Sequence, residues 1–505
     1  AAMLLTFPLI TLSALSIIYL LVAGHYEVEF VYNVTSNSMP LYLRVTALWG
    51  GQAGSLVFWS WLMSAFATAV TLRKWDRDRE FLPWVIVVSL VTLAFFLSLI
   101  IFFENPFARY WQTTGGQEIS AMFQPLGAIP LVPTDGRGLN PLLRHPGMII
   151  HPPMLYLGFV SFVIPFAFAI AALVTGRTDD RWIRLTRRWT LVAWVFLTIG
   201  LVLGSRWAYD VLGWGGYWGW DPVEIAAFMP WLSGTAFLHS VMIQEKRGLF
   251  KRWNIVLIII TYSLVIFGTF LTRSGVLSSV HAFAQSAIGP MFFAFIGVTF
   301  LISLGLLLSR WNDLRAEGQM QSLLSRESLF LFNNLLFMGI LIVCFWGVIF
   351  PLISELFTGQ KVTVGPPFYE RATGPLFGGL LFLMGIAPLS AWGHSTVKTL
   401  GRALWKPTAA SLVVLVVMFA SGIRSFGALL GLWLASFAGF LTIYEYGREV
   451  LARHRRSGES LPVAMWRLSG RYRRRYGGFI IHVGVVLMAL GVLGIDLFQT
   501  ETQGS

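Results

Sequence analysis

Apolar residues recur along this chain in runs separated by shorter stretches that carry most of the polar and charged residues. An α-helix rises about 1.5 Å per residue, so about 20 apolar residues cross the hydrocarbon core of a bilayer. The runs predict an all-α polytopic integral membrane protein with thirteen transmembrane helices, expected as a single domain over residues 1–505. The expected spans are 3–23, 46–72, 83–103, 148–175, 189–204, 225–243, 252–271, 289–309, 329–350, 375–392, 408–421, 425–445 and 476–497.

Composition supports this class and excludes others. Hydrophobic residues make up 56% of the chain, charged residues 12%, and the mean hydropathy is +0.69, values that exclude a soluble fold. The only cysteine, Cys344, lies inside the ninth expected span, so no intramolecular disulfide or Cys-x-x-Cys motif exists, and any reacting thiols belong to a partner. The spans hold almost no acidic or basic residue apart from Glu445, whereas ion-translocating proteins carry intramembrane relays of such residues.

Lysine and arginine are concentrated in alternate loops. Six loops, beginning near residues 73, 176, 244, 310, 393 and 446, hold 28 of the 37 basic residues. Basic loops are typical of the cytoplasmic side, so segments 104–147, 205–224, 272–288 and 351–374 are expected on the outer side. The net charge of +13 is therefore mainly a topology signal. The run Arg471–Arg475 directly precedes a span, which favours anchoring to anionic membrane lipid over binding to nucleic acid.

The segment Trp214-Gly-Gly-Tyr-Trp-Gly-Trp-Asp-Pro-Val-Glu224 crowds aromatic rings into a glycine-rich loop before the sixth span. Flat side chains suit a flat ring ligand, and glycines allow close approach of the backbone. The candidate binding residues are Trp214, Gly215, Gly216, Tyr217, Trp218, Trp220 and Asp221. An interfacial aromatic belt is the alternative, although a belt does not require this spacing. Asp221, Pro222 and Glu224 predict a helix start, as N-cap, first and third residues.

Two histidines fall inside spans, where ionisable groups are costly and usually functional. His239 lies seventeen residues after Pro222, about 25 Å from the outer side, and His482 lies five residues after Gly477, about 8 Å from the inner side. In a core of about 30 Å these depths agree, and two imidazoles at one depth can ligate a haem iron from both faces. Nearby glycines are expected to make room for the macrocycle; they are Gly234, Gly477, Gly478 and Gly484. The alternative is a histidine bonded to a neighbouring backbone or hydroxyl group.

Two other histidines, His151 and His281, belong to the expected outer face. In His151-Pro-Pro-Met154 the prolines are expected to fix the ring direction through the turn. Both histidines are candidates to ligate a second haem at the surface, and an ordinary solvated histidine is the alternative. Arg206 and Arg273 also lie outside. Each suits a haem propionate, because guanidinium pairs bidentately with carboxylate; anchoring at lipid head groups is an equal alternative.

These residues resemble a known family. The segment Trp214–Glu224 resembles the tryptophan-rich WWD signature of the haem-handling protein superfamily. A longer resemblance, from about residue 35 to 497, is to the haem lyase membrane proteins of cytochrome c maturation. It rests on Leu48–Ser55, Gly138–Pro141, His151–Tyr156, Phe228–Leu232, Leu271–Gly275 and Ser279–Phe283.

The resemblance implies two haem sites. His239 and His482 would bind a permanent b-type haem, and His151 and His281 would ligate a second haem, the substrate, delivered by a periplasmic haem chaperone. The implied reaction joins that haem to the Cys-x-x-Cys-His motif of apocytochrome c at the outer face of the bacterial inner membrane. Thiol-handling and chaperone membrane subunits of apocytochrome c would be partners. The resident haem is expected to reduce the substrate haem with quinol as donor, a quinol:haem oxidoreductase activity.

Other members of the superfamily supply the alternatives. A haem transporter would export haem without bond formation; the smaller exporter has far fewer spans, so thirteen spans and a second histidine pair favour the lyase. A fused cytochrome synthase would add a soluble domain, which is not visible in this sequence. The haem lyase membrane proteins usually continue past the last span seen here, so a further outer-face segment and a final helix are expected beyond Ser505.

Overall fold

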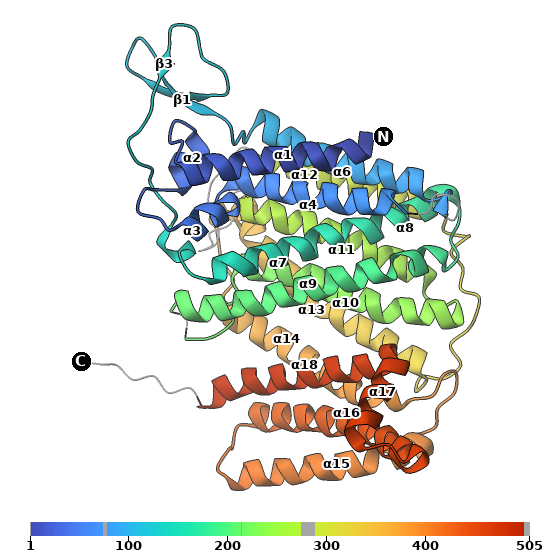
Figure 1. Ribbon diagram of the computed structural model, residues 1–505. Helices are drawn as coiled ribbons and strands as arrows, with labels where there is room; N and C mark the ends of the chain where they lie inside the picture. Colours follow the sequence, from blue (N-terminus) through green and yellow to red (C-terminus); the bar gives the residue numbers. More distant parts are fainter. Residues whose placement is uncertain (1, 74–77, 214, 274–287, 499–505) are drawn as a thin grey trace. The chain divides into compact units, whose positions relative to one another are not determined.

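The computed structural model describes residues 2–73, 78–213, 215–273 and 288–498 (Figure 1). The chain divides into two compact units: unit 1 comprises Ala1–Gly318 and Cys344–Pro366, and unit 2 comprises Gln319–Val343 and Pro367–Ser505. A single domain over residues 1–505 stays a prediction, and each unit is described by itself below.

Helices dominate both units. Those of unit 1 are α1 (Ala2–Ala23), α2 (Glu29–Val34), α3 (Leu41–Thr46), α4 (Gln52–Thr71), α6 (Leu82–Phe102), α7 (Gly147–Ser161), α8 (Val163–Thr175), α9 (Arg181–Val211), α10 (Pro222–Arg247), α11 (Lys251–Arg273) and α12 (Gly289–Ser309), with short 3₁₀ helices at Ala47–Trp49 and Pro141–Leu143. Helix α13 (Arg326–Thr358) contributes to both units. Unit 2 adds α14 (Pro366–Ile386), a 3₁₀ helix at Ala387–Leu389, α15 (Val397–Ala420), α16 (Phe426–Ser457), α17 (Leu461–Arg471) and α18 (Arg473–Phe498).

The predicted spans are confirmed. Within the described residues, thirteen helical segments are long and apolar enough to cross a membrane, and each corresponds to one expected span. The largest difference in length is α9, which has 31 residues where 189–204 was expected. A helix of that length extends about 46 Å, more than the hydrocarbon core of about 30 Å, so its polar ends project beyond the lipid tails.

Two boundaries differ from expectation for local reasons. The second span was expected from residue 46, but α4 begins at Gln52, because Gly51 is extended and α3 with a 3₁₀ turn precedes it. The fourth span was expected as one helix over 148–175. It consists of α7 and α8, which meet at Phe162.

The segment 104–147, which was expected on the outer side, contains a small antiparallel sheet that hydropathy did not predict. Its strands are β1 (Arg109–Gln112), β2 (Glu118–Ala121) and β3 (Ile129–Pro130), in the order β2–β1–β3. The backbone N–H of Glu29 donates to the carbonyl of Ala108 at 2.9 Å, which ties the sheet to α2. Strands this short produce no readable periodicity.

Asp135, in the same segment, accepts bonds from the N–H groups of Asn37 and Gly136, and these bonds hold the pKa of its carboxyl below the usual value.

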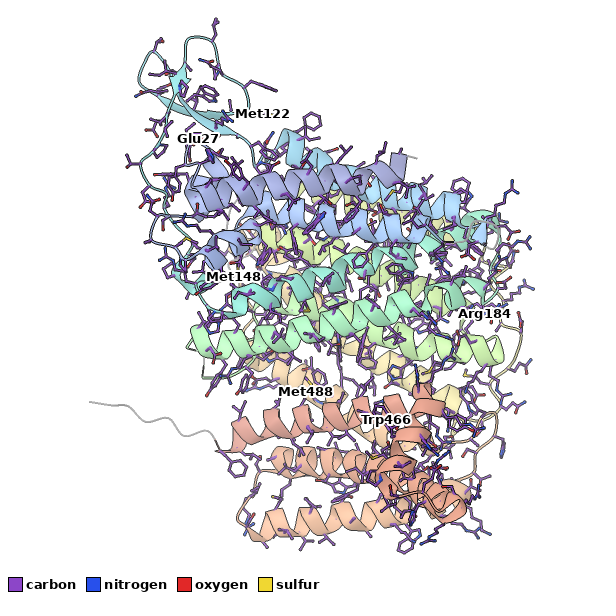
Figure 2. All side chains as sticks on the ribbon, viewed as in Figure 1. Glu27, Met122, Met148, Arg184, Trp466 and Met488 are labelled. Atoms are coloured by element: carbon purple, nitrogen blue, oxygen red, sulfur yellow. The ribbon has the colours of Figure 1, made fainter. Side chains whose placement is uncertain are left out.

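Alternate loops of unit 1 gather at opposite ends of its bundle, here named the sheet end and the basic end (Figure 1). At the basic end Arg177 pairs with Glu80 at 2.9 Å, linking the loops that follow α4 and α8. At the same end Arg252 donates to the carbonyl of Trp311 at 2.8 Å, linking the start of α11 to the loop that follows α12. Figure 2 shows Met148 toward the sheet end and Arg184 at the basic end. The four basic loops expected on one side are therefore at one end of this unit.

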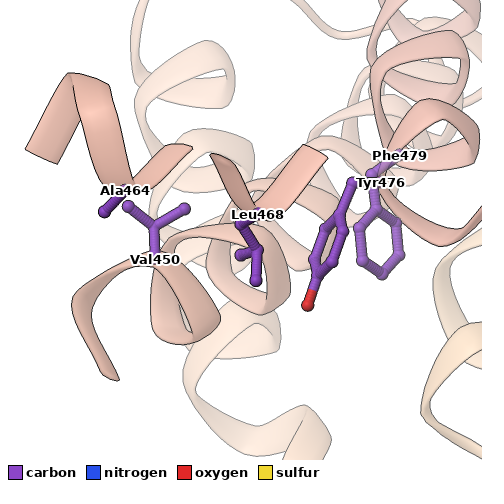
Figure 3. Packing of buried hydrophobic residues seen from close by; sticks show 5 residues of the cluster. All are labelled: Val450, Ala464, Leu468, Tyr476 and Phe479. Carbon is purple, nitrogen blue, oxygen red and sulfur yellow. The ribbon is translucent and has the colours of Figure 1, made fainter. Parts of the chain in front are cut away.

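In unit 2, α16 packs against α15, α17 and α18. A buried cluster joins α16, α17 and α18 and consists of Val450, Ala464, Leu468, Tyr476 and Phe479 (Figure 3). The hydroxyls of Tyr446 and Ser469 lie 2.7 Å apart beside it. The amphipathic α17, which the hydrophobic pattern did not predict, thus buries one face while Trp466 on the other face remains 81% exposed.

Candidate functional site

The aromatic loop, residues 212–221 without Trp214, lies between α9 and α10 at the sheet end of unit 1. The Glu224 carboxylate accepts bonds from the N–H groups of Gly219 and Asp221, and Asp221 accepts one from Val223 at 2.8 Å. Asp221 is the N-cap of α10, so the predicted helix start is confirmed. The bonds from Gly219 and Asp221 flank Trp220, which has a φ of +55°, a left-handed conformation that non-glycine residues rarely adopt.

Ring contacts attach the aromatic loop to both helices. Tyr217 stacks on Tyr209 near the end of α9, with ring centroids 4.5 Å apart. Trp218 meets the edge of Trp220 at 5.9 Å and the ring of Phe228 on α10 at 5.6 Å. Because these offset and edge-on contacts are the favourable geometries for aromatic pairs, the described part of the loop presents ordered rings at the end of α9.

His151 lies in α7 and faces α9, half-buried rather than solvated. Its Nδ1 lies 2.8 Å from the carbonyl oxygen of Gly200 and must donate to it, since a carbonyl only accepts. In the neutral ring Nε2 therefore carries the lone pair. A Cβ on Gly204 would lie 2.6 Å from Cε1 of His151, and the Trp207 ring lies 5.4 Å away. The ring direction is thus set by α9, and the expectation that a proline turn sets it is wrong.

The two prolines have a different structural consequence. Pro152 has no N–H and cannot bond the carbonyl of Met148 one turn earlier. That carbonyl accepts a bond of 2.8 Å from the indole N–H of Trp49 instead. Trp49, in the stretch Leu48–Ser55, therefore satisfies the backbone group that the histidine–proline sequence leaves without a helical partner.

The two candidate arginines differ in environment. Arg206 is largely exposed and pairs with Asp210 at 3.0 Å, one turn further along α9. Arg273, at the end of α11, is only 6% exposed and donates to the hydroxyl of Tyr156 at 2.9 Å and to that of Ser55 at 2.5 Å. Its Nε is buried without a hydrogen-bond acceptor in the described part of the chain. Arg273 is therefore too deeply buried for anchoring at lipid head groups.

His239 lies half-buried on α10, and its Nδ1 donates to the carbonyl of Thr235 at 2.8 Å. The backbone-bonded alternative considered for this residue is thus correct for Nδ1. It does not exclude ligation, because iron-ligating imidazoles commonly donate the other ring N–H to a carbonyl and bind through Nε2. A Cβ on Gly234 would lie 2.8 Å from Cζ of Phe162, so this glycine allows close side-chain packing. The expectation that Gly234 makes room for a macrocycle is wrong.

His482 lies half-buried on α18 of unit 2. A Cβ added at Gly477, Gly478 or Gly484 would meet no described atom within 4 Å. Gly478 is one helical turn before His482 and leaves space beside that imidazole. Within its own unit, His482 therefore has open space beside its ring, and ligation of one haem by His239 and His482 stays a prediction. Among the described residues no cluster of three or more histidine, cysteine or acidic side chains suggests another kind of metal site.

Two candidate residues, Trp214 and His281, lie outside the described residues. Within the described residues, the structure shows three features that sequence reasoning missed. They are the Trp49 bond, the packing of His151 on Gly200 and Gly204, and the contact of Trp194 with the turn that carries His239. The spacing Gly200-Leu-Val-Leu-Gly204 was a readable signal for the second feature, because small residues four apart let membrane helices approach closely.

The chain is similar to several known proteins. Residues 49–281 match the family model of the cytochrome C assembly protein, a range that includes His151, the aromatic loop and His239. The chain is similar to the cytochrome c-type biogenesis protein CcmF of Haemophilus influenzae, with 36% identity over 98% of this chain and 73% of that protein. It is also similar to the cytochrome c-type biogenesis protein CycK of Rhizobium meliloti, with 36% identity over 99% of this chain and 71% of that protein. A solved structure of the cytochrome c heme lyase CcmF aligns with a TM-score of 0.74 and 29% identity, covering 96% of this chain and 69% of that one.

Proposed function

The chain belongs to the CcmF family of cytochrome c-type biogenesis proteins, and on this premise we propose that it is the haem lyase subunit of cytochrome c maturation. In this role it takes haem from a periplasmic haem chaperone and promotes its attachment to an apocytochrome c. One observation carries the proposal: the end of α9 contacts both His151 and the aromatic loop. A candidate iron ligand and a group of flat rings therefore share one end of one helix.

The sheet end of unit 1 would be the periplasmic face of the bacterial inner membrane. This assignment rests on the basic loops gathered at the opposite end. Apocytochrome c and the membrane subunits that handle its thiols would dock at the sheet end. The residues that act on the substrate haem all belong to segments expected on this side.

His151 and His281 would hold the iron of the substrate haem, and the aromatic loop would orient the macrocycle. The residues for this second role are Trp214, Gly215, Gly216, Tyr217, Trp218, Trp220 and Asp221. Arg206 and Arg273 would pair with propionates. The buried Arg273 supports this role, since a buried guanidinium without a carboxylate partner in the described residues favours an anion.

The reaction itself requires placement more than acid–base chemistry. Each cysteine thiol of a Cys-x-x-Cys-His motif adds across a vinyl C=C bond of the substrate haem: an S–C bond forms and the thiol hydrogen goes to the other vinyl carbon. No oxidant is consumed. The protein would contribute by fixing the vinyl groups beside the two thiols, which is catalysis by proximity and orientation.

His239 and His482 would be the axial ligands of a resident haem b. The supporting observations are the carbonyl bond that leaves the lone pair on Nε2 of His239 and the space beside His482. A haem held by these residues would supply one-electron transfer from a membrane quinol, which keeps the substrate haem ferrous.

The quinol step has a direct test. Anaerobic addition of a short-chain quinol to the purified, oxidised protein is expected to reduce most of its haem, because the bis-histidine site is the proposed acceptor. The reduced α-band reports the extent, and dithionite defines full reduction in the same sample. Haem that responds to dithionite and stays oxidised with quinol would remove quinol from the proposal.

A substitution at Gly204 tests the outer site. Gly204→Ala places a Cβ 2.6 Å from Cε1 of His151, so the imidazole must move. We expect a several-fold lower yield of holocytochrome c in cells that depend on this chain, with unchanged resident haem absorption. Gly297→Ala on α12 is the matched control, since a Cβ there meets no described atom within 4 Å. Equal yields from both variants would show that the packing of His151 on α9 is unimportant.

A further inference from the structure

Helices α9 and α10 are joined by a reciprocal pair of hydrogen bonds. The indole N–H of Trp194 on α9 donates to Oγ1 of Thr235 on α10 at 2.8 Å. In return, the indole N–H of Trp231 on α10 donates to Oγ1 of Thr198 on α9, also at 2.8 Å. On each helix the threonine follows the tryptophan by four residues, so both lie on one face. These four residues are named the Trp–Thr clasp.

The hydroxyl groups of the clasp are used in two directions. Oγ1 of Thr235 donates to the carbonyl of Trp231 at 2.6 Å, and Oγ1 of Thr198 donates to that of Trp194 at 2.7 Å. Each hydroxyl thus accepts from the opposite helix and donates within its own. The two indole rings are nearly parallel, with centroids 6.1 Å apart. In a membrane-spanning region, where water does not compete for such groups, this arrangement fixes the rotation of α10 against α9.

The clasp lies one helical turn from His239. The carbonyl that accepts Nδ1–H of His239 belongs to Thr235, the same residue whose hydroxyl binds Trp194. The preceding residue, Gly234, packs against Phe162, so this turn is held from two directions. On the other side, Trp231 stacks on Phe228, which contacts the aromatic loop through Trp218.

We propose that Thr235 and Trp194 are positioning residues for His239. They hold the carbonyl that takes the Nδ1 proton, and so keep the imidazole in the tautomer and orientation in which Nε2 ligates iron. This proposal rests on the proposed resident haem and names residues that control its ligand. A fixed acceptor at the second ring nitrogen also raises the basicity of the ligand, which stabilises the ferric state.

Two variants test the proposal. Thr235→Val removes the hydroxyl and keeps the shape, and Trp194→Phe removes the donor and keeps an aromatic ring. Both are expected to weaken haem retention about tenfold and to raise the midpoint potential of the haem, because loss of such support typically costs 10–100-fold in affinity. Thr235→Ser restores the hydroxyl and is expected to recover both properties. Haem titration of the haem-free protein and redox potentiometry measure them.

The matched control is the same type of bond elsewhere in unit 1, where the indole N–H of Trp61 donates to Oγ1 of Thr11 at 2.8 Å between α4 and α1. Thr11→Val and Trp61→Phe should leave affinity and potential unchanged. The proposal fails if the clasp variants match these controls, or if Thr235→Ser does not recover what Thr235→Val loses. If Thr235→Val does not fold, Trp194→Phe decides.

Different results would contradict the proposed haem ligand and the positioning role proposed for the clasp. If the wild-type protein binds no haem, or His239→Ala retains it, the assignment of the ligand is wrong, and the clasp proposal is overturned with it. If His239→Ala abolishes binding while both clasp variants bind normally, the ligand assignment stands and only the positioning role is lost.

Discussion

Purified protein that carries His239→Ala is expected to lose its b-type haem absorption, and so is protein that carries His482→Ala. Each substitution removes one proposed axial ligand and leaves a cavity in place of a nitrogen donor. Changes to the hydrogen-bond partners of metal-ligating histidines already cost 10–100-fold in affinity, so removal of a ligand should lower the haem content by more than about tenfold. The absorption spectrum of detergent-solubilised protein, oxidised and reduced, measures this loss.

Histidines outside the proposed sites supply the controls for this experiment. His394 is exposed, and Nδ1 of His25 pairs with Glu27 at 2.9 Å, so alanine at either position should leave the spectrum unchanged. Size-exclusion profiles of all four variants separate haem loss from unfolding. Full haem absorption in both His239→Ala and His482→Ala would mean that the ligands were assigned wrongly.

His151→Ala is expected to give the opposite pattern: the resident absorption stays and the yield of holocytochrome c falls at least about tenfold. The imidazole is the proposed iron ligand for the substrate haem, and its ring fills the space left by Gly204. Loss of that ring removes the ligand without altering α10 or α18. Haem staining of a co-expressed cytochrome c, normalised to the protein made, gives the yield. His281→Ala should behave in the same way.

Rescue by a small molecule sharpens this second experiment. His151→Gly leaves a ring-sized space, and external imidazole should restore part of the yield by occupying it. His25→Ala is the control and should respond to neither the substitution nor imidazole. Normal yields from both His151→Ala and His281→Ala would remove the two residues from the substrate site, whereas rescue of His151→Gly would assign its contribution to the imidazole itself.

The membrane-length helices could be predicted completely, whereas the short α2, α3 and α17 could not. Each of the thirteen expected spans corresponds to a membrane-length helix in the described residues, because a run of about 20 apolar residues has few other stable structures. The boundaries were less accurate where charges continue a helix beyond the lipid. The eleventh span was expected over 408–421, but α15 begins at Val397 and includes Lys398, Arg402 and Lys406. A helix needs no apolar residues once it has left the bilayer core.

The start of α10 could also be predicted, because capping is a local property. Asp221, Pro222 and Glu224 are close in sequence, and their bonds in the structure are those that the spacing indicated. The small sheet within residues 104–147 could not be predicted in the same way, since its strands have two to four residues and depend on α2 for a partner.

By itself, the sequence determined the class of the protein, the number and order of its spans, the alternation of basic loops and the histidines that merit testing. Only the tertiary structure decided what each side chain meets: Gly200 for His151, Thr235 for His239, Trp49 for the carbonyl that Pro152 leaves free, and burial for Arg273. The physical reason is that an apolar sequence does not determine how a helix is rotated about its own axis. A span that is apolar all round specifies its length and depth in the bilayer, but not which face turns toward a neighbouring helix. That rotation is set by glycine contacts and interhelical hydrogen bonds between residues far apart in the chain.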